Sequence, residues 1–130
     1  PSVAYGNLSK IEEAPVTLIL PPDTRFHEHM PELWPHMPDA GKMFRENSAL
    51  AETTAFRNGT LQGAYLILAA RALGLDVGPM SGFDNEKLDS AFFPDGRYKS
   101  NFLMNIGFGD DRGLYSRGPR LDFEQAVTLA

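Results

Sequence analysis

The chain has 130 residues, a net charge of −5 and no cysteine. This length suits one domain, so we expect residues 1–130 to form a single domain. The 12 basic and 17 acidic residues form no basic stripe, which argues against a nucleic-acid partner. Without cysteine there are no disulfides and no thiolate chemistry, which suits a reducing compartment such as the cytoplasm. The sequence has no apolar run long enough for a bilayer and no signal peptide.

The first elements predicted are a helix and a strand. Residues 4–13 have the pattern of the end of a helix, and the prolines at 15 and 21 bound the apolar run 16–20. That run does not alternate between apolar and polar residues. It is therefore typical of a strand buried on both faces.

The next stretch, residues 21–41, holds five prolines and excludes a long regular element. Its apolar content, including Phe26 and Trp34, argues against a free linker. We expect residues 26–44, and in particular Phe26, Trp34 and Phe44, to form a wall or lid of a substrate pocket.

A long helix is predicted from a cap at Asn47 or Ser48 to Leu73. Residues 64–70 are apolar on nearly every side, which is typical of a buried helix. The glycines at 59 and 63 permit a close approach of a second helix. We therefore expect this helix to pack against a partner.

Gly74 directly follows the helix and is predicted to end it in the left-handed conformation. Residues 75–77 suit a short extended segment. Residues 78–82 are predicted to be a loop in which the backbone can closely approach a ligand.

The last third of the chain predicts two short helices and one strand. Asp84 can cap a helix whose inner side would carry Leu88, Ala91 and Phe92. A turn follows at residues 94–96, and a second clear strand runs over residues 102–108. Asp122 and Gln125 have the spacing of a capping box for a last helix.

These elements predict a sheet flanked by helices, of class α/β or α+β. His27 and His29 would face one side of an extended segment and could share a metal ion. Although His36 lies nearby, no third ligand is evident, so we predict no metal site.

Three motifs resemble the nitroreductase family of FMN enzymes: residues 70–76 (ARALGLD), 78–84 (GPMSGFD) and 101–110 (NFLMNIGFGD). The malonic semialdehyde reductases of bacterial pyrimidine degradation are the subgroup most similar to these motifs. The similarity runs from about residue 5 to 127 and is loose over residues 21–45.

The resemblance implies an α+β sandwich, in which helices flank a mixed sheet and a long central helix forms a homodimer. It also implies that the family's N-terminal segment, with its basic residues for the flavin phosphate, is absent from this chain.

The resemblance further implies a set of FMN-binding residues. Asn7 and Lys10 would meet the pyrimidine edge of the flavin, where a cation stabilises the anionic reduced ring. Arg117 would reach the phosphate with its guanidinium fork. By itself, an Asn and a Lys three residues apart is only a weak signal for a flavin site. Arg120 could also reach the phosphate, but its place is more typical of a surface arginine.

The same family places the segment matching Pro79, Met80, Ser81 and Gly82 beside the flavin ring, with a backbone N–H toward flavin N5. Many relatives have Glu where Ser81 stands and Lys where Tyr115 stands.

The predicted function is therefore an FMN-dependent oxidoreductase that uses NADH or NADPH. Its second substrate would be malonic semialdehyde or another small carbonyl, nitro or quinone compound, reduced in a ping-pong cycle without a protein nucleophile. The alternative is a non-catalytic flavin-binding or dimerisation module.

Overall fold

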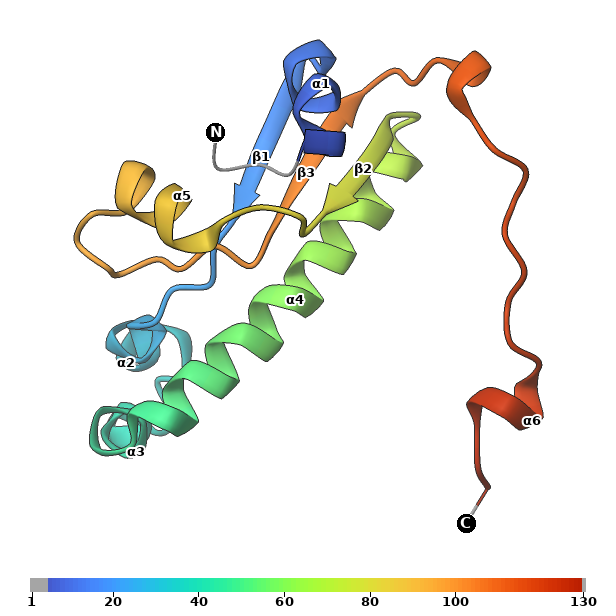
Figure 1. Cartoon of the computed structure of the whole chain (residues 1–130). Coiled ribbons are helices and arrows are strands. Elements are labelled where there is room, and N and C mark those ends of the chain that lie inside the picture. The colour runs from blue at the N-terminus through green and yellow to red at the C-terminus, as the bar shows by residue number, and fades with distance from the viewer. Residues whose placement is uncertain (1–4, 130) are drawn as a thin grey trace.

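The computed structural model describes residues 5–129, which form a small sheet crossed by one long helix (Figure 1). The elements in chain order are α1 (Tyr5–Glu13), β1 (Val16–Leu20), η1 (Phe26–His29), α2 (Met30–Leu33), η2 (Pro38–Ala40), α3 (Gly41–Glu46), α4 (Ser48–Ala72), β2 (Asp76–Met80), α5 (Asn85–Phe92), β3 (Phe102–Gly107), η3 (Asp111–Gly113) and α6 (Phe123–Ala126). The expected α+β architecture is confirmed.

The strands form one sheet in the order β1-β3-β2. Leu18 of β1 and Pro79 of β2 both lie opposite Met104 of the central strand. Both pairs are antiparallel, whereas the resemblance implied a mixed sheet. Pro79 is accommodated because β2 is an edge strand of the described sheet, where a missing N–H breaks no ladder.

The long helix begins and ends as predicted. The Asn47 side chain accepts a hydrogen bond of 3.0 Å from the backbone N–H of Leu50, which makes it the N-cap. Gly74 has φ of +79°, and the backbone N–H of Leu75 bonds to the carbonyl of Ala70. This is a Schellman motif, for which a residue tolerant of positive φ is required.

α4 packs on one face of the sheet through its small residues. A Cβ on Gly63 would meet the Phe102 ring at 2.4 Å, so the absence of a side chain lets helix and strand approach closely. Side chains alternate along β3, and the two fully buried ones, Leu103 and Met104, therefore lie on opposite faces. α1 contacts the face opposite α4, where Asn105 Nδ2 donates a 2.7 Å hydrogen bond to the carbonyl oxygen of Lys10.

The expectation that α4 is buried all round is wrong for the single chain. Tyr65 is 74% exposed and Leu68 66% exposed, although both lie in the apolar run. β1 is likewise only half-buried, with Val16 exposed. The physical reason is that, among the described residues, one sheet covers one side of α4 and nothing covers the other.

Two smaller expectations are also corrected. The segment predicted to loop from Gly78 is part of β2 as far as Met80. α5 is capped by Asp84 as expected, and Leu88 is buried. However, Ala91 and Phe92 are exposed, because the hydrogen bonds that hold α5 come from Asn85 and Asp89, which bind Ser100.

The C-terminal segment leaves the sheet after β3 and extends away from the body before α6 (Figure 1). Residues 108–129 are all exposed. The predicted capping box is present at α6, where the Gln125 side chain accepts the Asp122 N–H at 3.1 Å. Since every residue from 108 to 129 is exposed, no core fixes the place of this segment.

Candidate functional site

The structure separates the predicted flavin residues into three groups. Lys10 lines a hollow of about 540 Å³ over the sheet face that α1 covers, together with Gly78, Asn105 and Leu114. Pro79, Met80 and Ser81 line a second hollow of about 350 Å³ with residues of α4. We call these the Lys10 hollow and the Pro79 hollow. β2 contributes to both, with Asp76 to Gly78 in the Lys10 hollow and Pro79 and Met80 in the Pro79 hollow.

The floor of the Lys10 hollow is held by an asparagine. Asn105 accepts a 2.8 Å hydrogen bond from Thr17 Oγ1 and donates one to the Lys10 carbonyl, which ties α1 to β1 and β3. The Lys10 side chain is exposed and has no ion pair within the described range 5–129. Its charge is therefore available to a ligand.

The sequence analysis did not single out Asn105. The signal in the sequence was an amide side chain in the middle of the apolar strand 102–108. A polar side chain that is buried in a sheet needs a hydrogen-bond partner. The strand pattern alone could not say that α1 would supply that partner.

Asp76 forms the other polar edge of the Lys10 hollow. The backbone N–H of Gly109 bonds to this carboxylate at 2.8 Å, and Arg71 pairs with it. These two contacts, the Gly109 N–H first, hold the pKa of Asp76 below its usual value, so it stays ionised near neutral pH. They also fix the point at which the C-terminal segment leaves the sheet.

At the end of β2 the backbone presents unpaired donors. The N–H groups of Ser81 and Gly82 make no hydrogen bond to any described residue, and both residues are exposed. Asn7 is half-buried on α1 and lines neither hollow. A segment with free N–H groups at a sheet edge can receive the oxygen or nitrogen acceptors of a planar ligand.

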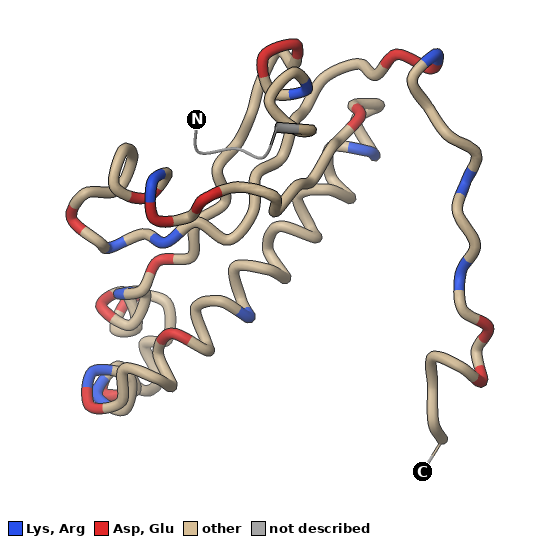
Figure 2. The backbone as a smooth tube through the Cα atoms, in the orientation of Figure 1, with Lys and Arg blue, Asp and Glu red and all other residues tan. Residues whose placement is uncertain are grey.

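Arg117 lies on the exposed C-terminal segment, three residues beyond Leu114 of the Lys10 hollow. Within the described chain its guanidinium has no hydrogen bond or ion pair, whereas Arg120 bonds to the Gly118 carbonyl at 2.9 Å. Figure 2 shows that basic residues are spaced along this segment. No contact brings Arg117 to Lys10 or to the Ser81 segment in the single chain.

The predicted substrate wall is only partly packed. Phe26 and Phe44 meet edge to face, with ring centroids 4.9 Å apart, and Phe44 is buried. Trp34 is 46% exposed. None of these three residues lines the Lys10 or the Pro79 hollow.

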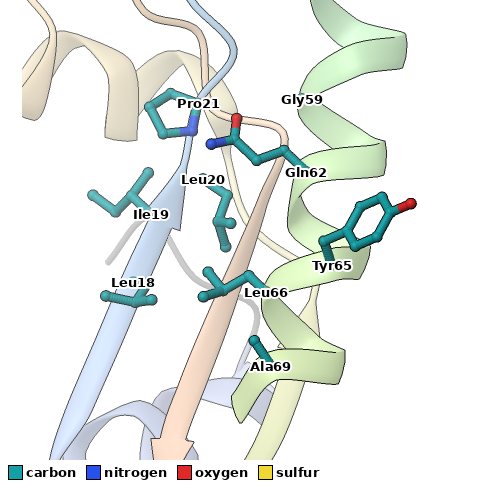
Figure 3. A pocket seen from close by; sticks show the side chains of 9 residues that line it. All are labelled: Leu18, Ile19, Leu20, Pro21, Gly59, Gln62, Tyr65, Leu66 and Ala69. Carbon is teal, nitrogen blue, oxygen red and sulfur yellow. The ribbon is translucent and has the colours of Figure 1, made fainter.

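An apolar groove of about 480 Å³ runs between β1 and α4 (Figure 3). Leu20 and Leu66 point toward one another across it, while Tyr65 points away from the strand. Among the described residues, no group of three or more His, Cys, Asp or Glu is placed to hold a metal ion. None of the described helices is both long and apolar enough to cross a membrane.

The family model described as the nitroreductase family matches residues 2–108. The chain belongs to the nitroreductase family. The match takes in α1, all three strands and the segment after β2.

Curated relatives agree with this assignment. A candidate NADH dehydrogenase/NAD(P)H nitroreductase of Burkholderia lata is 60% identical over 129 residues, which are 99% of this chain and 66% of that protein. HadB of Ralstonia pickettii carries the same kind of name and is 56% identical over 131 residues, 99% of this chain and 67% of HadB. The chain therefore spans about two thirds of the length of the curated relatives it matches.

Solved structures show the same fold at low identity. The nitroreductase YdfN of Bacillus subtilis superposes with a TM-score of 0.87 at 22% identity, over 98% of this chain and 69% of YdfN. A nitroreductase of Exiguobacterium sibiricum, solved in complex with FMN, gives a TM-score of 0.81 at 20% identity, over 98% of this chain and 68% of that protein.

Proposed function

We propose that this member of the nitroreductase family is an FMN-dependent oxidoreductase that takes reducing equivalents from NADH or NADPH. The observation that carries the proposal is the family match over residues 2–108, which includes the exposed residues Ser81 and Gly82, whose N–H groups make no hydrogen bond to any described residue. The names of the curated relatives and the FMN complex of the E. sibiricum protein support it. The single domain over residues 1–130 is part of the same proposal.

The residues available in the chain fit a flavin chemically. FMN, when bound, accepts a hydride from the nicotinamide and passes it to a second substrate. Lys10 is an exposed cation and Asn7 an amide on α1, and these are the groups that would bind an anionic ring edge. We propose that Pro79, Met80, Ser81 and Gly82 hold the ring through their backbone, and that Arg117 binds the phosphate.

We propose that the second substrate is a small carbonyl, nitro or quinone compound, with malonic semialdehyde as one member of this set. Phe26, Trp34 and Phe44 would form a wall of its pocket. Since they lie apart from the Pro79–Gly82 segment in one chain, we propose that this wall belongs to the site of a partner copy. The proposed compartment is the cytoplasm.

The proposed assembly is a homodimer built on α4. Leu61, Tyr65 and Leu68 follow the helical spacing of one stripe, and each is more than half exposed. An apolar stripe of this kind on a long helix is typical of an interface.

The test of the proposed function is the colour of the intact purified protein and its response to NADH under anaerobic conditions. We expect a yellow protein whose visible flavin absorbance bleaches on addition of NADH or NADPH. A colourless protein that binds no added FMN would overturn the proposal.

The non-catalytic module remains the second candidate, because Ser81 and Tyr115 depart from the residues of many relatives. It predicts a yellow protein that neither nicotinamide bleaches, whereas the enzyme predicts bleaching by at least one of them.

A further inference from the structure

A polar hollow of about 390 Å³ lies at the start of α4, away from both hollows described above. Arg25, Arg45, His27 and Ser48 line it together with two carboxylates, Glu28 and Glu52. We call it the Arg45 hollow. Figure 2 shows basic and acidic residues close together where α3 joins α4.

Both carboxylates already face cations of the segment that precedes β3. Glu28 Oε2 lies 3.3 Å from Arg97 Nη1, and Glu52 Oε1 lies 3.3 Å from Lys99 Nζ. Arg97 also binds Asp23 through three hydrogen bonds, two from Nε and one from Nη2. Cations outside the hollow thus neutralise most of the negative charge of its two carboxylates.

The two arginines of the hollow, by contrast, have no carboxylate partner among the described residues. Among residues 5–129, neither the Arg25 nor the Arg45 guanidinium lies within ion-pair distance of a carboxylate. The Arg45 guanidinium lies against Gly41, where Nη1 is 3.1 Å from the position that a Cβ would take. A chain whose net charge is −5 therefore has two arginines without a carboxylate partner, among the described residues, in the lining of one hollow.

Two further groups favour a negative ligand. The Nδ1 of His27 is buried and has no hydrogen-bond partner among the described residues, which is costly unless another group meets it. Rotation of the imidazole about χ2 would carry this nitrogen to the other side of the ring. Ser48 is the first residue of the 25-residue helix α4, whose N-terminal end carries partial positive charge.

We propose that the Arg45 hollow binds a small oxyanion, a carboxylate or phosphate group of a soluble molecule. Guanidinium forks pair with two oxygens of such a group, and the serine hydroxyl and the imidazole can add hydrogen bonds. The volume is within the range of small-molecule sites. The proposal does not rest on the flavin.

Calorimetric titration of the intact protein with inorganic phosphate and, separately, with malonate tests this site. We expect saturable binding of at least one of them at fixed ionic strength. Arg45→Gln should weaken that binding about tenfold or more, since a charged hydrogen bond is lost. Arg45→Lys should weaken it less, because the charge remains while the fork is lost. Arg25→Gln should also weaken anion binding, which tests the second arginine independently.

Arg57→Gln is the matched control, because Arg57 is an exposed arginine of the neighbouring helix α4 and does not line the hollow. It removes the same charge and should leave binding unchanged. Tighter binding of phosphate or of malonate shows whether the site takes a phosphate group or a carboxylate group. The proposal is overturned if neither anion saturates the wild type, or if Arg57→Gln weakens binding as much as Arg45→Gln and Arg25→Gln do.

Discussion

Arg117 is a residue whose chemistry can be tested without knowledge of the whole site. It is exposed, and its guanidinium has no hydrogen bond or ion pair to any described residue. If it binds the FMN phosphate, Arg117→Ala should cost about 2–3 kcal/mol, a roughly 30- to 150-fold weaker FMN Kd. Titration of the apoprotein followed by flavin fluorescence measures this change.

Riboflavin is the control ligand for Arg117, because it lacks the phosphate. It should bind wild type and Arg117→Ala almost equally, and Arg117→Lys should recover only part of the FMN affinity. An equal loss of riboflavin and FMN affinity would show that Arg117 is not a phosphate ligand.

The packing around Gly63 leaves no room for a side chain. Gly63→Ala would place a Cβ 2.4 Å from the Phe102 ring and 3.6 Å from Leu20 Cδ2. We expect a loss of about 1–3 kcal/mol in the free energy of unfolding, since the ring must leave its place between helix and sheet. Denaturant unfolding measures it. Gly6→Ala on α1 is the control, because a Cβ there meets nothing within 4 Å and should be neutral or slightly stabilising.

Trp34 tests the proposed substrate wall. It is half-exposed in the single chain, so its removal should disturb the fold little. We expect Trp34→Ala to change the KM for the second substrate more than the rate of flavin reduction by NADH. Stopped-flow measurement of the two half-reactions separates these effects, and equal changes in both would remove the wall from the proposal.

At the scale of elements, the segment after β1 and the segment before β3 meet at the same end of the sheet, where an ion pair joins them. Arg97, just before β3, donates hydrogen bonds of 3.1, 3.2 and 2.8 Å to Asp23, just after β1. Partial burial raises the pKa of Asp23, but the hydrogen bonds from Arg97 and the Arg25 N–H, and the charge of Arg97, outweigh burial and hold the pKa below 3.8.

This pKa direction sets the pH range in which the pair stabilises the fold. Because the folded pKa lies below the unfolded value of 3.8, the contribution is complete above that pH and is lost as the pH falls through the folded pKa. Asp23→Asn should therefore lower the free energy of unfolding at neutral pH, and the difference from wild type should shrink below about pH 4. Urea unfolding at a series of pH values tests it, and a difference that stays constant down to pH 2 contradicts it.

At the scale of the whole molecule, the exposed stripe on α4 predicts an obligate homodimer burying more than about 2,000 Å². The double variant Tyr65→Glu, Leu68→Glu should sediment as a monomer, because two charges would have to be buried in the interface. Ser90→Glu with Ala91→Glu is the control, since both residues are exposed on α5 and lie outside α4. A wild type that is monomeric at micromolar concentration would contradict the proposed assembly.

The sequence by itself determined the elements whose signals are local. Asn47 and Asp84 can satisfy backbone N–H groups of the turn that follows them, and Gly74 tolerates positive φ, so the ends of α4 and the start of α5 were predictable. The apolar runs 16–20 and 102–108 likewise predicted β1 and β3. The three motifs at 70–76, 78–84 and 101–110 identified the family, which the match over residues 2–108 confirms.

The tertiary structure decided what depends on residues far apart in the chain. Only the pairing of β2 with β3 shows that Gly78 to Met80 is strand rather than loop, because a ladder needs a partner that local sequence does not name. Only the position of α1 gives Asn105 its role beneath Lys10. The same apolar run in α4 was predicted to be buried, yet burial depends on what covers each side of a helix, and one sheet covers only one side.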